Sequence, residues 1–373
     1  KVMGRVAMFG VYVEILGTFG VAVVLGIHGF HHGLGFLTST LGAQHASANA
    51  LGLNFGGSWL GAALIAVLAP VYIFYGFESA GDISEETRNA GRQVPRAMRL
   101  SLLSGGIASF VLTAALLLAM PTGAASANLT VQNGGVPYIF SQLPHGMQDV
   151  LLILIIFAFF SCGSAVQGAG SRLAFSYARD GALPGSTWIS EVSQRFKTPA
   201  NALFGGALVT VLFIALAFAA PTHDVKIWFI TYPANTNVLV SLVSFGVSGI
   251  YLSFLLTVIG SMIARARGWA PAGTFTMGRW AWPVSVVAGL YLVLMLVNVV
   301  LPSGTDSGRA YFNLDWITLL VMAVVAGAGI IVYFAARGGR EIGAHIIDTD
   351  APGAGAPGAG GQGTAAESVA SQT

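Results

Sequence analysis

The sequence is 373 residues long, 55% hydrophobic and only 9% charged, and its formal net charge is +2. Soluble domains carry about 25% charged residues, so this composition excludes an ordinary soluble protein and indicates an integral membrane protein. The basic residues stand singly or in pairs between apolar blocks, which excludes a continuous nucleic-acid-binding surface. A single cysteine, Cys162, excludes internal disulfides and multi-cysteine metal sites.

Eight stretches of mostly apolar sequence are about 20 residues long, the length that a helix needs to cross a bilayer. These stretches lie near residues 6–28, 58–78, 99–120, 149–172, 200–220, 236–263, 280–301 and 315–336. We therefore predict an all-α fold, a polytopic membrane protein with eight transmembrane helices in a transmembrane region over residues 1–346. Residues 347–373 are rich in Gly, Ala, Ser and Pro without periodicity, and they predict a disordered tail.

The distribution of positive charge orients the predicted spans. Of the 17 lysine and arginine residues, only Lys226 and Arg309 fall on one side of the membrane. The rest fall on the opposite side, in or beside the terminal segments and every second loop. Loops rich in lysine and arginine stay in the cytoplasm. We therefore predict a multi-pass protein with both termini of this chain, including the tail, in the cytoplasm. We expect the membrane to be the plasma membrane.

The first span carries a carboxylate, Glu14, about half-way along its length. Inserting an ionised side chain at that depth costs on the order of 2.5–3.5 kcal/mol, which favours the protonated form. Glu14 is therefore a candidate proton-coupling residue. The alternative is a protonated or hydrogen-bonded carboxyl that only packs between helices.

The first outer loop carries several histidines among glycines, namely His28, His31, His32 and His45. A His-rich tract can bind a metal ion, but no carboxylate or cysteine accompanies these side chains. We expect a polar outer loop without a metal ion, and a metal site is the alternative.

The second span is interrupted before it ends. Pro70 removes one backbone hydrogen bond, and Gly76 and Gly81 bracket the segment Phe77-Glu78-Ser79-Ala80. A spanning helix has no water to satisfy freed backbone groups, so such a break persists only where protein or a water-filled cavity lines it. A carboxylate at a break in a membrane helix is typical of a transporter's binding site. Ordinary packing around small residues is the alternative.

The side chains around this break supply the candidate substrate site. Backbone groups at Gly76, Phe77 and Glu78, together with half-helix dipoles, can hold a zwitterion or an ammonium group. Tyr72 and Tyr75 lie one turn apart and can form an aromatic wall or a cation–π partner for an amine. The charged run from Asp82 to Arg88 that follows is expected to be a solvated gate region.

The fourth span is rich in small and hydroxylated residues over 160–171. Such residues allow close helix approach, and the hydroxyls of Ser161 and Ser164 are also candidate substrate ligands. Close packing alone remains open as the alternative. No nucleophile–base pair, phosphate-binding glycine loop or zinc motif is present, so we predict neither an enzyme nor an ATP-driven pump.

Three motifs carry a resemblance to a known family: Gly76-Phe77-Glu78-Ser79-Ala80-Gly81, the run from Glu85-Glu86-Thr87-Arg88-Asn89 to Val94-Pro95-Arg96-Ala97, and Tyr177-Ala178-Arg179-Asp180-Gly181-Ala182-Leu183-Pro184. At these residues the chain resembles the amino acid–polyamine–organocation permeases, and within them the amino acid/choline transporter branch. The likeness extends over the chain up to the tail.

The resemblance implies a twelve-span protein whose first ten spans form an inverted five-plus-five repeat of LeuT type. The eight spans would correspond to the family's fifth to twelfth, so we expect a truncated form that lacks the first four. The break at Gly76 would be the family's discontinuous sixth helix. Glu14 would lie on the fifth helix, where some relatives carry a lysine that replaces a sodium ion. Its carboxylate departs from that pattern and leaves proton and sodium coupling both open.

The predicted function is a secondary-active transporter that moves amino acids or related amines by alternating access. Two alternatives are a membrane sensor or accessory subunit that binds amino acid without transport, and a passive channel. The expected partners are a small-molecule substrate and the lipid bilayer, with no nucleic acid. No cofactor is expected beyond a coupling ion, and the sequence identifies no protein partner.

Overall fold

The computed structural model describes residues 2–39, 49–51, 53–55, 58–122, 135–193, 195, 198–218, 225–227, 230–232, 238–270, 275–301 and 317–337. The predicted tail at 347–373 and His45 of the first outer loop lie outside the described residues.

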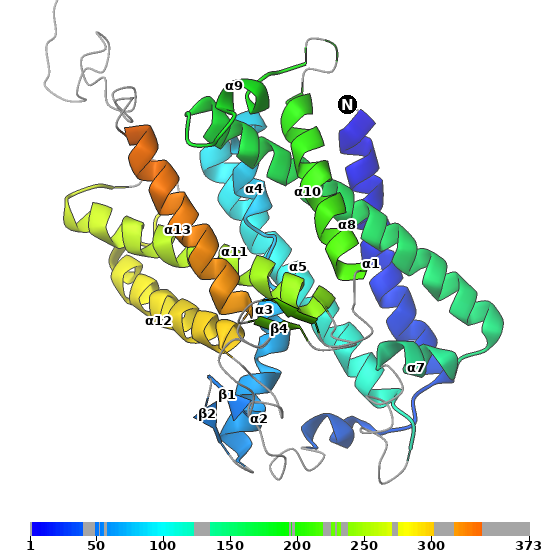
Figure 1. The fold of residues 1–373 in the computed structure, drawn as a ribbon. Coiled ribbons are helices and arrows are strands. Elements are labelled where there is room, and N and C mark those ends of the chain that lie inside the picture. The colour runs from blue at the N-terminus through cyan, green and yellow to red at the C-terminus, as the bar shows by residue number, and fades with distance from the viewer. Residues whose placement is uncertain are drawn as a thin grey trace, which may run out of the picture.

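Helices make up most of the described chain (Figure 1). The long ones are α1 (Val2–His28), α5 (Ala90–Leu118), α8 (His145–Arg179), α10 (Ala200–Phe218), α11 (Val238–Ala266), α12 (Ala281–Val300) and α13 (Ile317–Arg337). The short ones are α2 (Trp59–Ala66), α3 (Leu68–Ile73), α4 (Ser79–Asp82), α7 (Val136–Ser141) and α9 (Ser186–Ile189), with the 3₁₀ turns η1 (Leu34–Thr38), η3 (Ser84–Glu86) and η4 (Gly278–Trp280).

The helical class is confirmed, but the prediction of an all-α chain missed two small antiparallel hairpins in the connections. Strands β1 (Asn49–Ala50) and β2 (Leu53–Asn54) pair through Asn49 with Asn54 and Ala50 with Leu53. Strands β3 (Val225–Ile227) and β4 (Ile230–Tyr232) pair with Val225 opposite Tyr232. Strands of two or three residues leave too short a pattern in the sequence to be distinguished from a loop.

Five helices are long and apolar enough to cross a membrane: Met8–His28, Ala90–Leu118, His145–Arg179, Val243–Ala266 and Gly278–Val300. Shorter apolar helices cover Trp59–Ile73, Ala200–Ala215 and Met322–Val332. A helix suits this environment because all its backbone hydrogen bonds lie within the segment. The chain is therefore a multi-pass helical membrane protein, and the exact number of eight spans stays a prediction.

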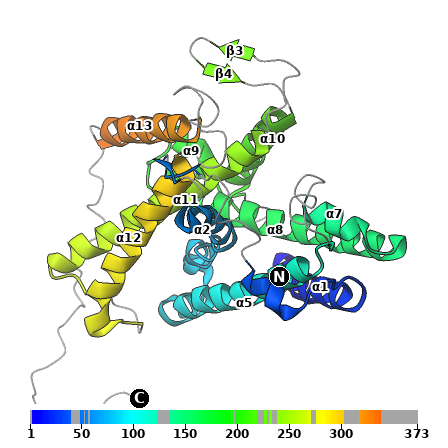
Figure 2. The same ribbon diagram turned by 90° about the horizontal axis from the view of Figure 1, so that it is seen from below.

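The helices form two packed groups with the broken second span between them (Figure 2). Helix α1 packs against α5 and α8, and α8 packs against α10; on the other side, α11 packs against α12 and α13. Each group has its own buried cluster. The first includes Leu25 of α1 and Leu151 of α8, and the second includes Val71 of α3, Val247 of α11 and Leu292 of α12.

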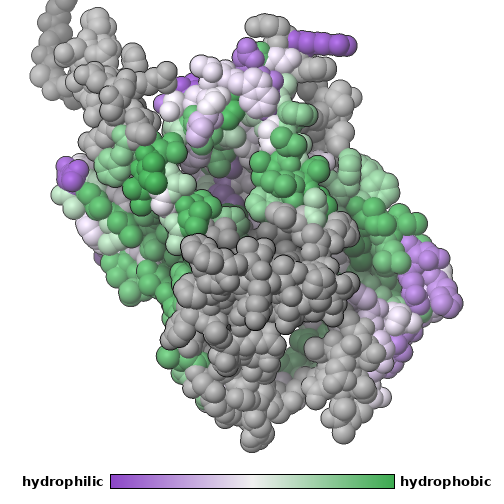
Figure 3. Space-filling model, in the orientation of Figure 1, coloured by the Kyte–Doolittle hydropathy of each residue, from purple (hydrophilic) through white to green (hydrophobic). Residues whose placement is uncertain are grey.

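Hydrophobic side chains cover the flanks of the molecule, as Figure 3 shows for one face, and hydrophilic ones gather toward its ends. Many of the exposed apolar residues lie on the long helices, for example Phe110, Phe159 and Leu290. Exposed apolar side chains on a membrane helix are compatible with contact with lipid, whose tails are as apolar as the side chains themselves.

Helices α1 and α8 cross closely at Gly10. A β-carbon added to Gly10 would collide with the Oγ atom of Ser161 and would lie 2.9 Å from the Cβ atom of Ser161. Only glycine leaves room for this crossing, which brings α1 against the part of α8 that carries the predicted serine ligands.

Replacing Gly10 with alanine is expected to destabilise the protein by about 1–3 kcal/mol, because overpacking forces the two helices apart. Thermal unfolding in detergent measures the loss as a lower midpoint. Gly17→Ala on the same helix is the matched control, since none of the described atoms lies within 4 Å of its added β-carbon. Adding Ser161→Gly to Gly10→Ala should recover the midpoint, and a failure to recover it would place the damage elsewhere.

Candidate functional site

The second span breaks over residues 74–78. Helices α2 and α3 are separated at Val67, and α3 ends at Ile73, where the amide of Phe74 still donates to the carbonyl of Pro70 at 2.9 Å. Regular helix resumes only at Ser79, in the single turn of α4. The predicted break is therefore present, and it lies at the predicted glycine.

The carboxylate of the break pairs with one of the break's own backbone amides. Gly76 adopts a positive φ of 99°, a conformation that residues with a β-carbon rarely reach. Its amide donates to Oε2 of Glu78 at 2.8 Å, and its carbonyl accepts from the amide of Ser79 at 3.2 Å. A hydrogen bond to a carboxylate is among the stronger kinds. Glu78 thus holds the turn that Gly76 makes.

The half of the span before the break is fastened to α11 and α12. The hydroxyl of Tyr72 is 2.8 Å from Oγ of Ser244 on α11. The Nδ2 atom of Asn298, which is fully buried on α12, donates to the carbonyl of Leu64 at 2.8 Å. Val71, also fully buried, packs in the second cluster. Tyr72 therefore contacts α11. Sequence analysis had instead predicted that it forms an aromatic wall of the substrate site.

The half after the break is fastened to α8 by two ion pairs, which we call the clasp. Arg172 donates to Glu86 through Nε at 2.6 Å and through Nη2 at 3.3 Å. Arg179 donates to Glu85 through Nη1 at 3.1 Å and Nη2 at 3.0 Å. Both pairs have the two-bond geometry that arginine forms with a carboxylate.

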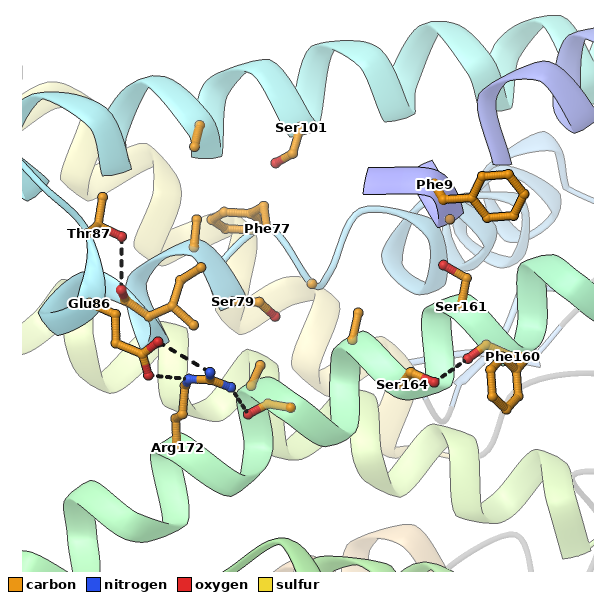
Figure 4. A pocket seen from close by; sticks show the side chains of 18 of the residues that line it. Phe9, Phe77, Ser79, Glu86, Thr87, Ser101, Phe160, Ser161, Ser164 and Arg172 are labelled. Carbon is orange, nitrogen blue, oxygen red and sulfur yellow. Dashed lines mark hydrogen bonds and ion pairs between the residues drawn. The ribbon is translucent and has the colours of Figure 1, made fainter. Parts of the chain in front are cut away.

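A cavity of about 740 Å³ lies beside the break, between α1, α4, α5 and α8 (Figure 4). Four of the predicted site residues line it: Gly76, Phe77, Ser161 and Ser164. The other four, Tyr72, Tyr75, Glu78 and Glu14, are not among its lining residues. Glu14 follows Val13, which does line the cavity. Whether any of these residues binds substrate or carries a proton stays a prediction.

The lining combines apolar walls with a few polar groups. The aromatic residues of the lining are Phe9, Phe77, Phe157 and Phe160, and the hydroxyl-bearing ones are Ser79, Thr87, Ser101, Ser161 and Ser164. Ser164 donates its hydroxyl to the carbonyl of Phe160 at 2.7 Å, so its oxygen is free only to accept. Pockets for small organic molecules have this size and this mixture of walls.

The charged residues of the lining are Glu86 and Arg172, at the η3 end of the cavity (Figure 4). Sequence analysis placed Glu86 in a solvated gate region and gave Arg172 no role. One signal in the sequence was informative: two adjacent glutamates precede two arginines that are seven residues apart and so lie on one face of a helix. Among the described residues, no three His, Cys, Asp or Glu side chains come together as a metal site.

Comparison with known proteins agrees with this architecture. A profile of the amino acid permease family matches residues 1–333. An uncharacterized amino-acid permease of Schizosaccharomyces pombe is 27% identical over 278 residues, which cover 74% of this chain and 46% of the relative. A Candida albicans protein named as a polyamine transporter is 25% identical over 267 residues, 70% of this chain and 45% of the relative. A thiamine transporter of Schizosaccharomyces pombe is 28% identical over 245 residues, which cover 63% of this chain and 38% of the relative.

The fold and the site are those of a multi-pass helical membrane protein with a cavity beside a broken helix. The chain belongs to the amino acid permease family, and so to the amino acid–polyamine–organocation superfamily. It spans less than half the length of these three relatives.

Replacing Gly76 with alanine is expected to cost roughly 1–2 kcal/mol, because the added β-carbon meets the backbone at positive φ. None of the described atoms lies within 4 Å of that β-carbon, so the cost would come from backbone strain alone. Gly81→Ala, in the α4 turn and equally open, is the control and should be neutral or slightly stabilising. Equal losses of unfolding free energy in the two variants would contradict the assigned conformation.

The clasp should resist acid. The hydrogen bond from Arg179 lowers the pKa of Glu85, and the hydrogen bond from Arg172 lowers the pKa of Glu86. A lowered pKa gives stability that is present above the unfolded value, about 4.3 for glutamate, and that is lost as pH falls through the folded value. The unfolding midpoint of the wild type should therefore exceed that of Glu85→Gln/Glu86→Gln by a constant amount between about pH 8 and 5. A difference that vanishes already between about pH 7 and 6 would refute the pairing.

Proposed function

We propose that the protein works as a secondary-active transporter of amino acids or related amines, by alternating access at the broken span. The observation that supports this most is the cavity beside a helix break whose backbone is held by one carboxylate. Unwound backbone of this kind, where it lines a cavity, is a recurrent way for transporters to bind substrate. Membership of the amino acid permease family supports the same function.

The names of the relatives support the substrate class. They include an amino-acid permease, a polyamine transporter and a thiamine transporter, and all three kinds of molecule carry amino groups. In the proposed complex the substrate lies beside the break, against the backbone near Gly76, and the negative charge of Glu78 favours a cationic substrate there although Glu78 is not among the lining residues. Apolar parts of the substrate lie against Phe77, and Ser161 accepts or donates a hydrogen bond from α8.

The remaining features of the proposal follow from the sequence. We propose eight spans in a LeuT-type arrangement in the plasma membrane, with both termini of the chain in the cytoplasm. This orientation agrees with the distribution of lysine and arginine among the loops. Coupling is to a proton or to sodium. Glu14, on the cavity-lining helix α1, is the candidate proton carrier.

Accumulation of a radiolabelled amino acid in proteoliposomes that contain the complete gene product tests the function. A transporter should concentrate the substrate against an imposed proton or sodium gradient and should saturate. Saturable binding without accumulation would indicate a sensor or accessory subunit, and flux that neither saturates nor shows competition would indicate a channel.

Glu78→Gln should weaken substrate affinity about tenfold or more, the effect of losing roughly 1.4 kcal/mol of binding free energy. Glutamine keeps an oxygen that accepts from the amide of Gly76, so the fold should survive while the negative charge is lost. Asp149→Asn, an exposed carboxylate near the start of α8, is the matched control and should behave as wild type. An unchanged rate and affinity in Glu78→Gln would remove Glu78 from the site.

A further inference from the structure

The two ion pairs of the clasp have the same chemistry but different surroundings. Glu86 and Arg172 line the cavity, whereas Glu85 and Arg179 are not among its lining residues. The Arg172 side chain is 23% exposed and the Arg179 side chain 48%. Only one of the two pairs can therefore meet a molecule inside the cavity.

The guanidinium of Arg172 is held in place without help from Glu86. Its Nη1 atom donates to the carbonyl of Gly168, one turn earlier on α8, at 3.0 Å. The Nε and Nη2 atoms form the fork that faces Glu86. If the Glu86 carboxylate moved away, the fork would still point into the cavity, and it would fit any other carboxylate equally well.

The η3 turn, in the same way, does not depend on Glu86 for its position. Glu85 fastens it to Arg179, and the hydroxyl of Thr87 donates to the carbonyl of Ile83 at 2.9 Å. The Glu86 side chain is 63% exposed, so it has room to turn toward a ligand. One pair of the clasp thus serves attachment, and the other is left free to exchange partners.

From these contacts we infer that Glu86 and Arg172 form a subsite for the head group of zwitterionic α-amino acids. When no ligand is bound, the two side chains pair with each other. The ligand's carboxylate replaces Glu86 on the Arg172 fork, and the ligand's ammonium group binds the released Glu86 carboxylate. Every charge is paired before and after the exchange. The ligand's side chain extends toward Phe77 and Phe160, along the apolar length of the cavity (Figure 4).

This inference rests on the proposed function and narrows its substrate class. An amine without a carboxylate can occupy Glu86 only by leaving the Arg172 fork without an anion, and an unpaired charge in a partly buried site is costly. The subsite should therefore prefer amino acids to the corresponding simple amines and to polyamines.

Equilibrium binding of two radiolabelled probes to the purified complete gene product tests the subsite. Phenylalanine and 2-phenylethylamine differ only in the carboxylate, and both carry an aromatic side chain suited to the cavity. Wild type should bind phenylalanine the more tightly. Arg172→Gln should weaken the binding of phenylalanine about tenfold or more, because the carboxylate contact is lost. It should not weaken the binding of 2-phenylethylamine, because the amine no longer has to separate Glu86 from an arginine.

Two further variants separate this role from a purely structural one. Arg179→Gln makes the same chemical change two turns along the helix, outside the cavity. Because it loosens the attachment of the η3 turn and removes no ligand contact, it should change the affinity of both probes equally, by about twofold at most. Arg172→Lys keeps the charge and the attachment to Glu86 but loses the fork, so it should fold as wild type and lose part of the phenylalanine affinity. This variant provides the answer if Arg172→Gln does not fold.

The subsite is overturned if Arg172→Gln weakens the binding of both probes equally, or if neither probe binds the wild type. It is also overturned if Arg179→Gln weakens phenylalanine binding as much as Arg172→Gln does. Its failure is distinguishable from failure of the proposed function. Accumulation of phenylalanine that is insensitive to Arg172→Lys would leave transport standing without the subsite. Binding that depends on Arg172 but leads to no accumulation would leave the subsite standing without transport.

Discussion

A helix that breaks inside a membrane must find partners within the protein for the backbone groups that it frees, and the structure depends on how the segment 74–78 meets this constraint. Gly76 turns at a positive φ that other residues avoid. Its amide takes the carboxylate of Glu78 as partner at 2.8 Å. Glu78 is therefore first a structural residue, and its negative charge comes to lie beside the cavity because the backbone requires it there.

The break is also the junction between the two helix groups. Before it, Val71 and the contacts of Tyr72 and Asn298 fasten the span to α11 and α12. After it, the clasp fastens the span to α8. The chain passes from one group to the other at Gly76, and the two groups also meet where α10 packs against α11. Movement of one group against the other would therefore act on the backbone at Gly76. A ligand bound at the break would be sensitive to that movement, which is the requirement of alternating access.

Much of this arrangement was predictable from the sequence, because lipid imposes simple rules on composition. The length of the apolar stretches identified a membrane protein, and Pro70 with Gly76 identified the break. The sequence motifs identified the family. Three-dimensional partners were not predictable. Helical spacing put Tyr72 on a face but did not say that this face meets Ser244, which is 172 residues away. Glu86 and Arg172 are 86 residues apart, and only the packing of α4 against α8 brings them together.

The central claim is that the cavity beside the break is where a small molecule binds. A cryo-electron microscopy structure of the complete gene product in phenylalanine tests it most directly. Our account predicts ligand density between Gly76 and Arg172, with the Glu86–Arg172 pair separated by the ligand's head group. Ligand density elsewhere, with this cavity empty and the pair intact at saturating phenylalanine, would contradict it.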